Sequence, residues 1–94
     1  MKYVLILGGG WQQVESIIAI KKLGLKIIVI DALENAPGLV YADVSIQADI
    51  KSPEHVISSC MHYLSNICCI ISPTNDAGQI TASTLNELLY LNLH

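Results

Sequence analysis

Apolar runs of strand length alternate along the chain with segments of helical periodicity. The longer runs contain β-branched residues and have no polar side to face solvent, which is typical of strands buried on both faces. These predicted strands cover 2–7, 25–32 and 67–72, and a shorter one, with alternating polarity, covers 43–47. The apolar stripes that predict helices fall within 11–24, 52–65 and 79–93.

The helix boundaries have recognisable signals. Ser52 is a suitable N-cap for the helix over 52–65, and Pro53 stands at its first position, where the missing N–H costs nothing. Gly24 follows the last periodic residue of the helix over 11–24 and is the expected terminator.

Buried strands that alternate with amphipathic helices predict an α/β fold with a parallel sheet and helices on both faces. Right-handed crossovers then give a doubly wound four-stranded sheet in the order 3-2-1-4, with the short third strand at one edge. Ligands of such sheets gather at the carboxyl ends of the strands where the order reverses. The loops at that point are GGGWQQ (8–13) and SPTNDAG (72–78).

The composition narrows the function. The chain has 94 residues, of which 52% are hydrophobic, and a formal charge of −3. This length and composition predict a single globular domain over 1–94. All five basic residues are lysines, so a bound anion must be held by backbone N–H groups or lysine. There is no basic patch or aromatic ladder, which argues against a nucleic-acid partner. The apolar runs are too short for a membrane span and no signal peptide is apparent, so a cytoplasmic location is expected.

The cysteines and histidines give no metal-binding pattern. Cys60, Cys68 and Cys69 lack CxxC spacing and have no histidine at ligand spacing, and we interpret them as small buried hydrophobic residues. His55 and His62 are seven residues apart on the predicted second helix and are expected to be neighbours on its surface, without a third ligand. No catalytic nucleophile–base arrangement is evident.

The glycine loop allows two interpretations. Gly8 and Gly10 match the first two positions of G-x-G-x-x-G, but Gln13 occupies the third, where glycine permits close helix–strand packing. Trp11 adds bulk where a pyrophosphate would lie. Both features argue against a dinucleotide, although the N–H groups of the helix start still form an anion site. A tight turn without a ligand is the alternative.

Two other polar positions are also open to two interpretations. Asp31, at the end of the second strand, suits a ribose hydroxyl or the capping of its own loop. Asn75 and Asp76 suit the N-cap of the last helix, with or without a ligand at the same loop.

The order of the motifs is more specific than any one of them. A glycine loop ending in Gln13 precedes an acid at Asp31 and a turn at 35–38, NAPG. The pair Ala42–Asp43 then leads into the short strand, Asp49 opens the next connection, and the fourth strand ends in 74–76, TND. This order resembles the N-terminal, or pre-ATP-grasp, domain of ATP-grasp ligases, in particular the carbamoyl-phosphate-synthase-like group, over nearly the whole chain.

The resemblance implies a three-domain enzyme that makes an acyl-phosphate from a carboxylate and ATP and transfers it to an amine or thiol. ATP and Mg²⁺ would lie between the later lobes, and this domain would hold a small anionic metabolite. The substrate-binding residues that the resemblance implies are Gly8, Gly9, Gly10, Trp11, Gln13 and Asp31, with Thr74, Asn75 and Asp76 opposite them.

The chain stops at His94, where the ATP-grasp lobes of the family begin. We therefore expect a truncated domain with no catalytic residue and no cofactor of its own, whose partners are the missing lobes or a second copy of the chain. The alternatives are a small NAD-binding Rossmann domain and a non-catalytic assembly domain whose apolar surface mediates self-association.

Overall fold

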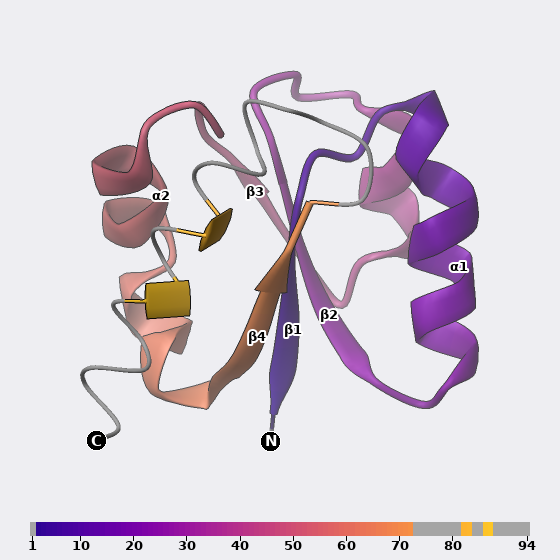
Figure 1. Cartoon of the computed structure of the whole chain (residues 1–94). Coiled ribbons are helices and arrows are strands. Elements are labelled where there is room, and N and C mark those ends of the chain that lie inside the picture. The colour runs from indigo at the N-terminus through magenta and orange to yellow at the C-terminus, as the bar shows by residue number, and fades with distance from the viewer. Residues whose placement is uncertain (1, 73–81, 84–85, 88–94) are drawn as a thin grey trace.

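The computed structural model describes residues 2–72, 82, 83, 86 and 87. They form a parallel four-stranded sheet in the order β3-β2-β1-β4, as predicted (Figure 1). The strands are β1 (Tyr3–Leu7), β2 (Lys26–Asp31), β3 (Val44–Gln47) and β4 (Ile67–Ile71). The helices are α1 (Val14–Lys22) and α2 (Pro53–Ser59), with 3₁₀ turns η1 (Trp11–Gln13), η2 (Pro37–Tyr41) and η3 (Met61–Asn66).

The sheet separates two apolar cores, because successive side chains of a strand point to opposite faces. On one face Leu5 and Leu7 of β1 pack with Val56 of α2. On the other face Val4 and Ile6 pack with Ile17 of α1. β1 and β2 are almost completely buried on both faces, as their continuous apolar runs predicted.

The capping predictions are confirmed. The Ser52 hydroxyl accepts a hydrogen bond from the backbone N–H of His55 at 3.2 Å, at the start of α2. After α1, Gly24 adopts a φ of 82°, and its N–H donates to the carbonyl of Lys21 at 3.0 Å. A left-handed residue at this position ends a helix, and glycine adopts it without the clash of a Cβ atom.

The helix predicted over 52–65 is wrong in its second half. The α-helix ends at Ser59, and 3₁₀ turns continue over Met61–Asn66. The junction is Cys60, which has a φ of −112° and is buried. The tighter winding after Cys60 changes which side chains face the sheet, because 3₁₀ turns have three residues per turn. Met61, predicted to be on the apolar stripe, is consequently 61% exposed.

The interpretation of all three cysteines as buried is also wrong. Cys60 is buried, Cys69 is partly buried and Cys68 is exposed. The cause is a β-bulge: Tyr3 pairs with Ile67 and Val4 pairs with Cys69, so Cys68 is an extra residue without a partner in β1. A bulge interrupts the alternation of side chains that the interpretation assumed.

β4 is an edge strand, and a side chain occupies part of its open side. The Asn86 amide accepts from the backbone N–H of Ile70 at 3.1 Å and donates to the carbonyl of Ile70 at 2.7 Å. These are the two bonds that a neighbouring strand would make. Covering an edge in this way blocks pairing with another chain.

Asp43 links three elements at the amino ends of the strands. Its carboxylate accepts from the backbone N–H of Ile27 at 2.8 Å and from Lys21 of α1 at 2.9 Å, and Lys26 lies 3.8 Å away. The hydrogen bond from Ile27, followed by that from Lys21, holds the pKa of Asp43 below its ordinary value of 3.8. Asp43 therefore anchors α1 and β2 at the end of the sheet opposite the glycine loop.

At the carboxyl ends, η2 crosses directly over the glycine loop. The N–H of Gly38 donates to the carbonyl of Gly9 at 2.6 Å. A Cβ atom on Gly38 would lie 2.6 Å from Cδ1 of Ile17 and 2.8 Å from the carbonyl oxygen of Gly9. The two backbones approach so closely that only glycine fits at position 38.

Replacing Asp43 by asparagine tests its contribution to stability. Asparagine keeps an acceptor for Ile27 but removes the charge, so at neutral pH we expect a loss of about 1 kcal/mol in the free energy of unfolding. Because the folded pKa is lowered, the wild-type advantage is complete above the ordinary pKa of 3.8 and disappears as the pH falls through the folded value. Urea unfolding of both proteins at a series of pH values measures this difference in the free energy of unfolding. Glu34→Gln, which removes an exposed carboxylate, is the control. A pH-independent difference in stability between wild type and Asp43→Asn would contradict a stabilising role for the Asp43 charge.

Gly38→Ala tests the backbone crossing. The added methyl group meets backbone atoms of Gly9, which no rotamer can avoid, so we expect a loss of about 1–3 kcal/mol in the free energy of unfolding. Gly10→Ala is the matched control, because among the described residues its added Cβ meets the side-chain oxygen of Gln13 and no backbone atom outside its chain neighbours. Equal losses for the two variants in urea unfolding would show that the crossing does not limit stability.

Candidate functional site

The glycine loop turns sharply at the end of β1. Gly8 has a φ of 102°, a conformation that side chains other than glycine rarely adopt, and its N–H donates to the carbonyl of Ile30 at 2.7 Å. A Cβ atom on Gly9 would lie 2.9 Å from Cγ1 of Val29. Gly10 precedes η1 with extended backbone dihedral angles and no side-chain cap. Each glycine of the loop is thus in a different environment.

The Asp31 carboxylate joins the two loops that follow β1 and β2. Its Oδ2 accepts from the N–H of Gly9 at 2.8 Å, and its Oδ1 accepts from the N–H of Leu33 at 2.9 Å. Each carboxylate oxygen therefore has a backbone donor within these loops. This is the loop-capping arrangement that was one of the two interpretations of Asp31, and it gives the glycine loop a fixed conformation.

Gln13 and Trp11 differ strongly in their exposure to solvent. Gln13 is 6% exposed, and its amide group lies beside the position that a Cβ atom would take on Gly8 and on Gly10. The buried Gln13 side chain therefore packs against the loop. Trp11 is 81% exposed and leaves its indole ring at the surface next to the loop.

The start of the helical segment leaves backbone donors available. Within the described part of the chain, the N–H groups of Gly10, Trp11 and Gln12 make no hydrogen bond, whereas the N–H of Gln13 already donates to the carbonyl of Gly10 at 3.0 Å. The first N–H groups of a helix have no partner inside the helix and carry a partial positive charge. Such a set of donors can bind a phosphate or a carboxylate.

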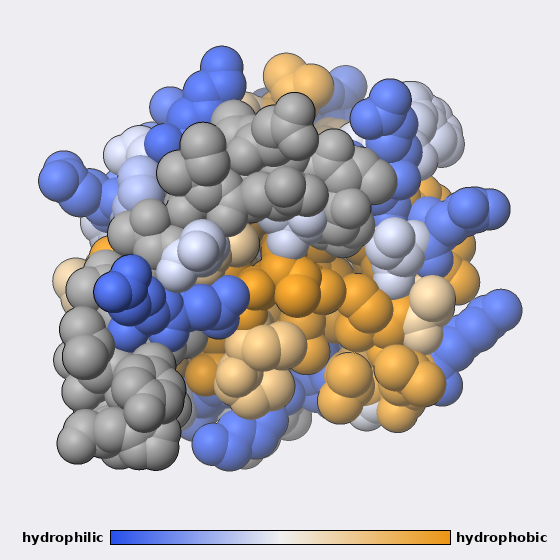
Figure 2. All heavy atoms as spheres, viewed as in Figure 1, coloured by the Kyte–Doolittle hydropathy of each residue, from blue (hydrophilic) through white to orange (hydrophobic). Residues whose placement is uncertain are grey.

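An open groove lies between α1 and the end of β4. It has a volume of about 510 Å³. The described residues that line it are Ser16, Ala19, Ile20, Ile71 and Ser72. Figure 2 shows apolar surface in the region between β4 and α1. Leu23 and Leu25, at the end of α1 and the start of β2, are 76% and 42% exposed.

The structure brings the predicted residues Gly8, Gly9, Gly10, Gln13 and Asp31 into one hydrogen-bonded or contacting group, with Trp11 at its surface. Thr74, Asn75 and Asp76 lie outside the described residues. Sequence reasoning recognised the turn over 35–38 but missed the contact of Gly38 with Gly9. It also missed Ile50, whose Cδ1 lies 3.8 Å from the position of a Cβ atom on Gly8.

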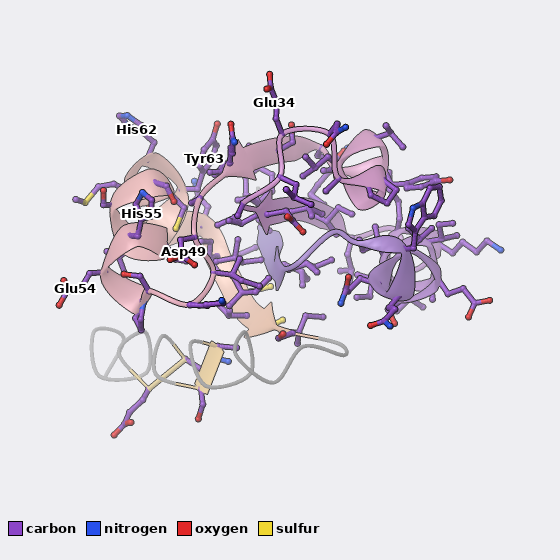
Figure 3. The ribbon with its side chains drawn as sticks, turned by 90° about the horizontal axis from the view of Figure 1, so that it is seen from above. Glu34, Asp49, Glu54, His55, His62 and Tyr63 are labelled. Carbon is purple, nitrogen blue, oxygen red and sulfur yellow. The ribbon has the colours of Figure 1, made fainter. Side chains whose placement is uncertain are left out.

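The histidines do not form the expected pair. Nδ1 of His55 accepts from the backbone N–H of Asp49 at 3.4 Å. In the view from above, His55 lies next to Asp49, while His62 belongs to η3 and points away from the domain (Figure 3). Among the described residues, no three metal-ligating side chains lie together, and no helix is both long and apolar enough to span a membrane.

Comparison with known proteins finds curated relatives over part of the chain and solved structures with the same fold. No family model matches the chain. The chain is 42% identical over 53 residues to a formate-dependent phosphoribosylglycinamide formyltransferase from Prochlorococcus marinus subsp. pastoris, a match that covers 56% of this chain and 14% of the relative. The chain thus spans only a small part of the curated relatives that it matches.

Two solved structures share the fold over almost the whole chain. Phosphoribosylglycinamide synthetase from Anaerococcus prevotii superposes with a TM-score of 0.79 and 28% identity, over 92% of this chain and 22% of the synthetase. N5-carboxyaminoimidazole ribonucleotide synthetase from Thermotoga maritima superposes with a TM-score of 0.72 and 23% identity, over 94% of this chain and 23% of that protein. The chain therefore resembles the N-terminal, Rossmann-like domain of these ATP-grasp ligases.

Proposed function

We propose that this chain is the substrate-side domain of an ATP-grasp ligase that joins a carboxylate to an amine or a thiol. The observation that carries the proposal is the set of backbone donors at Gly10, Trp11 and Gln12, which lie at the carboxyl ends of the central strands and have no partner in the described residues. These donors suit an anionic metabolite.

The names of the similar proteins narrow the substrate class. The formyltransferase and both synthetases are named for phosphoribosylglycinamide or for an aminoimidazole ribonucleotide. Each of these compounds carries a ribose phosphate. We assign the donors of the glycine loop to such a phosphate, with the exposed ring of Trp11 beside it.

The loop supplies hydrogen bonds but little charge. The chain has no arginine, and within the described residues no lysine side chain is hydrogen-bonded to the glycine loop or to η1. Binding by this domain alone therefore depends on backbone donors and on the partial charge of the helix start. We expect a dissociation constant on the order of 1 mM, which corresponds to about −4 kcal/mol.

ATP and Mg²⁺ would be bound by further lobes of the full ligase and not by this domain. The solved relatives are more than four times the length of the matched segment, which supports such an arrangement. The partly buried apolar side chains of the α1–β4 groove and the exposed Leu23 and Leu25 offer a surface for these lobes. In this proposal the domain positions the metabolite and contributes no group to the chemical step.

The anion site is tested by NMR titration of the isotopically labelled chain with ribose 5-phosphate. We expect shifts of the amide signals of Gly10, Trp11 and Gln12 that saturate in the millimolar range. Trp11→Glu places a negative charge beside the donors and should abolish the shifts. Leu23→Glu makes the same change at a comparably exposed apolar position at the other end of α1 and should keep them. Shifts that survive in Trp11→Glu would refute this position for the phosphate.

Calorimetry separates the ligase domain from the NAD-binding alternative. We expect no micromolar binding of MgATP, because the described domain corresponds to less than a quarter of the similar ligases and the proposal assigns ATP to their other parts. We expect none of NAD, because both oxygens of Asp31 already accept backbone hydrogen bonds. Ribose 5-phosphate is the control ligand. Micromolar affinity for NAD would favour a dinucleotide-binding domain, and micromolar affinity for MgATP would contradict the division of labour proposed above.

A further inference from the structure

The pair Cys68–Cys69 lies on an edge strand and takes no part in the proposed function. In a regular strand two successive side chains point to opposite faces, so adjacent thiols cannot meet. Here the bulge between the pairs Tyr3–Ile67 and Val4–Cys69 removes that alternation at Cys68. The bulge therefore allows the two thiols to lie on the same side of the strand.

The surroundings of the two thiols support this geometry. The Cys68 thiol donates a hydrogen bond to the carbonyl of Tyr3 at 3.3 Å, which holds the exposed thiol close to the strand backbone. Burial, and then the neighbouring Cys68, raise the pKa of the Cys69 thiol. Cys68 is exposed and Cys69 is partly buried, so a reagent in solution reaches the Cys68 thiol first.

We propose that Cys68 and Cys69 form a vicinal dithiol site that chelates a soft, thiophilic centre, represented by a trivalent arsenical. With a monosubstituted arsine oxide, two As–S bonds form, the As–O bond is lost, and both thiol protons leave with that oxygen as one water molecule. No atom changes its oxidation state, so the reaction needs no further oxidant or reductant. The third cysteine, Cys60, is buried in the core on the α2 side and takes no part.

Chelation by two thiols distinguishes this site from a single reactive cysteine. Once one As–S bond has formed, the second thiol acts at an effective concentration on the order of millimolar or higher. A monothiol competitor at about 1 mM should therefore leave the adduct in place, whereas a small dithiol should remove it.

Intact-mass spectrometry of the full chain after incubation with phenylarsine oxide tests the site. We expect one adduct that has lost one water molecule, that leaves one free thiol in a titration and that survives about 1 mM monothiol. Cys68→Ser and Cys69→Ser should each lose this dehydrated, monothiol-resistant adduct. Cys60→Ser is the matched control and should keep it.

Several results would overturn the proposal. These are a wild-type adduct that retains its oxygen, a dehydrated adduct that persists in Cys68→Ser or Cys69→Ser, and loss of the adduct in Cys60→Ser. Circular dichroism and urea unfolding of each variant verify that a lost adduct reflects the missing thiol and not an unfolded chain. Because the readout does not involve the glycine loop, it is independent of the proposed ligase function.

Discussion

The loops at the carboxyl end of the sheet depend on one residue, Gly9. Its N–H donates to Asp31 at the end of β2, and its carbonyl accepts from Gly38 in η2. The backbone of Gly9 is thereby hydrogen-bonded both to the end of β2 and to η2. Each hydrogen bond requires close approach, since a Cβ atom on Gly9 would lie 2.9 Å from Val29 and one on Gly38 would meet Gly9 itself.

This constraint explains the unusual donors of the site. Asp31 and Gly38 satisfy the polar groups of Gly9, and within the described residues the N–H groups of the next three residues make no hydrogen bond where the chain enters η1. The buried Gln13 side chain packs against the loop. Asp31, the residue that a dinucleotide site would use for the ribose, here accepts hydrogen bonds from the backbone of Gly9 and Leu33. The anion site of the proposal is then a consequence of a rigid frame rather than of charged side chains.

The edge of the sheet that is formed by β4 is subject to a different constraint. Within the described residues no strand pairs with β4 on its outer side, and the Asn86 amide bonds to Ile70 in place of a strand. The bulge at Cys68 lies on the same strand, toward its start. Bulges and side-chain caps are common at sheet edges, where they limit pairing with other chains. The exposed thiol of Cys68 is a by-product of this local irregularity.

The sequence by itself determined the strands, their order, the caps at Ser52 and Gly24, and the glycine loop, because hydrophobic period and capping chemistry are local properties. Only the tertiary structure decided that Asp31 holds Gly9, that Gly38 has room for no side chain, and that Cys68 faces solvent. It also decided where α2 stops, although the periodic pattern continues to position 65. These features depend on which residue of one strand or loop lies opposite another. The hydrophobic period and the composition do not specify which residues lie opposite one another. The packing of the two cores against the sheet determines it.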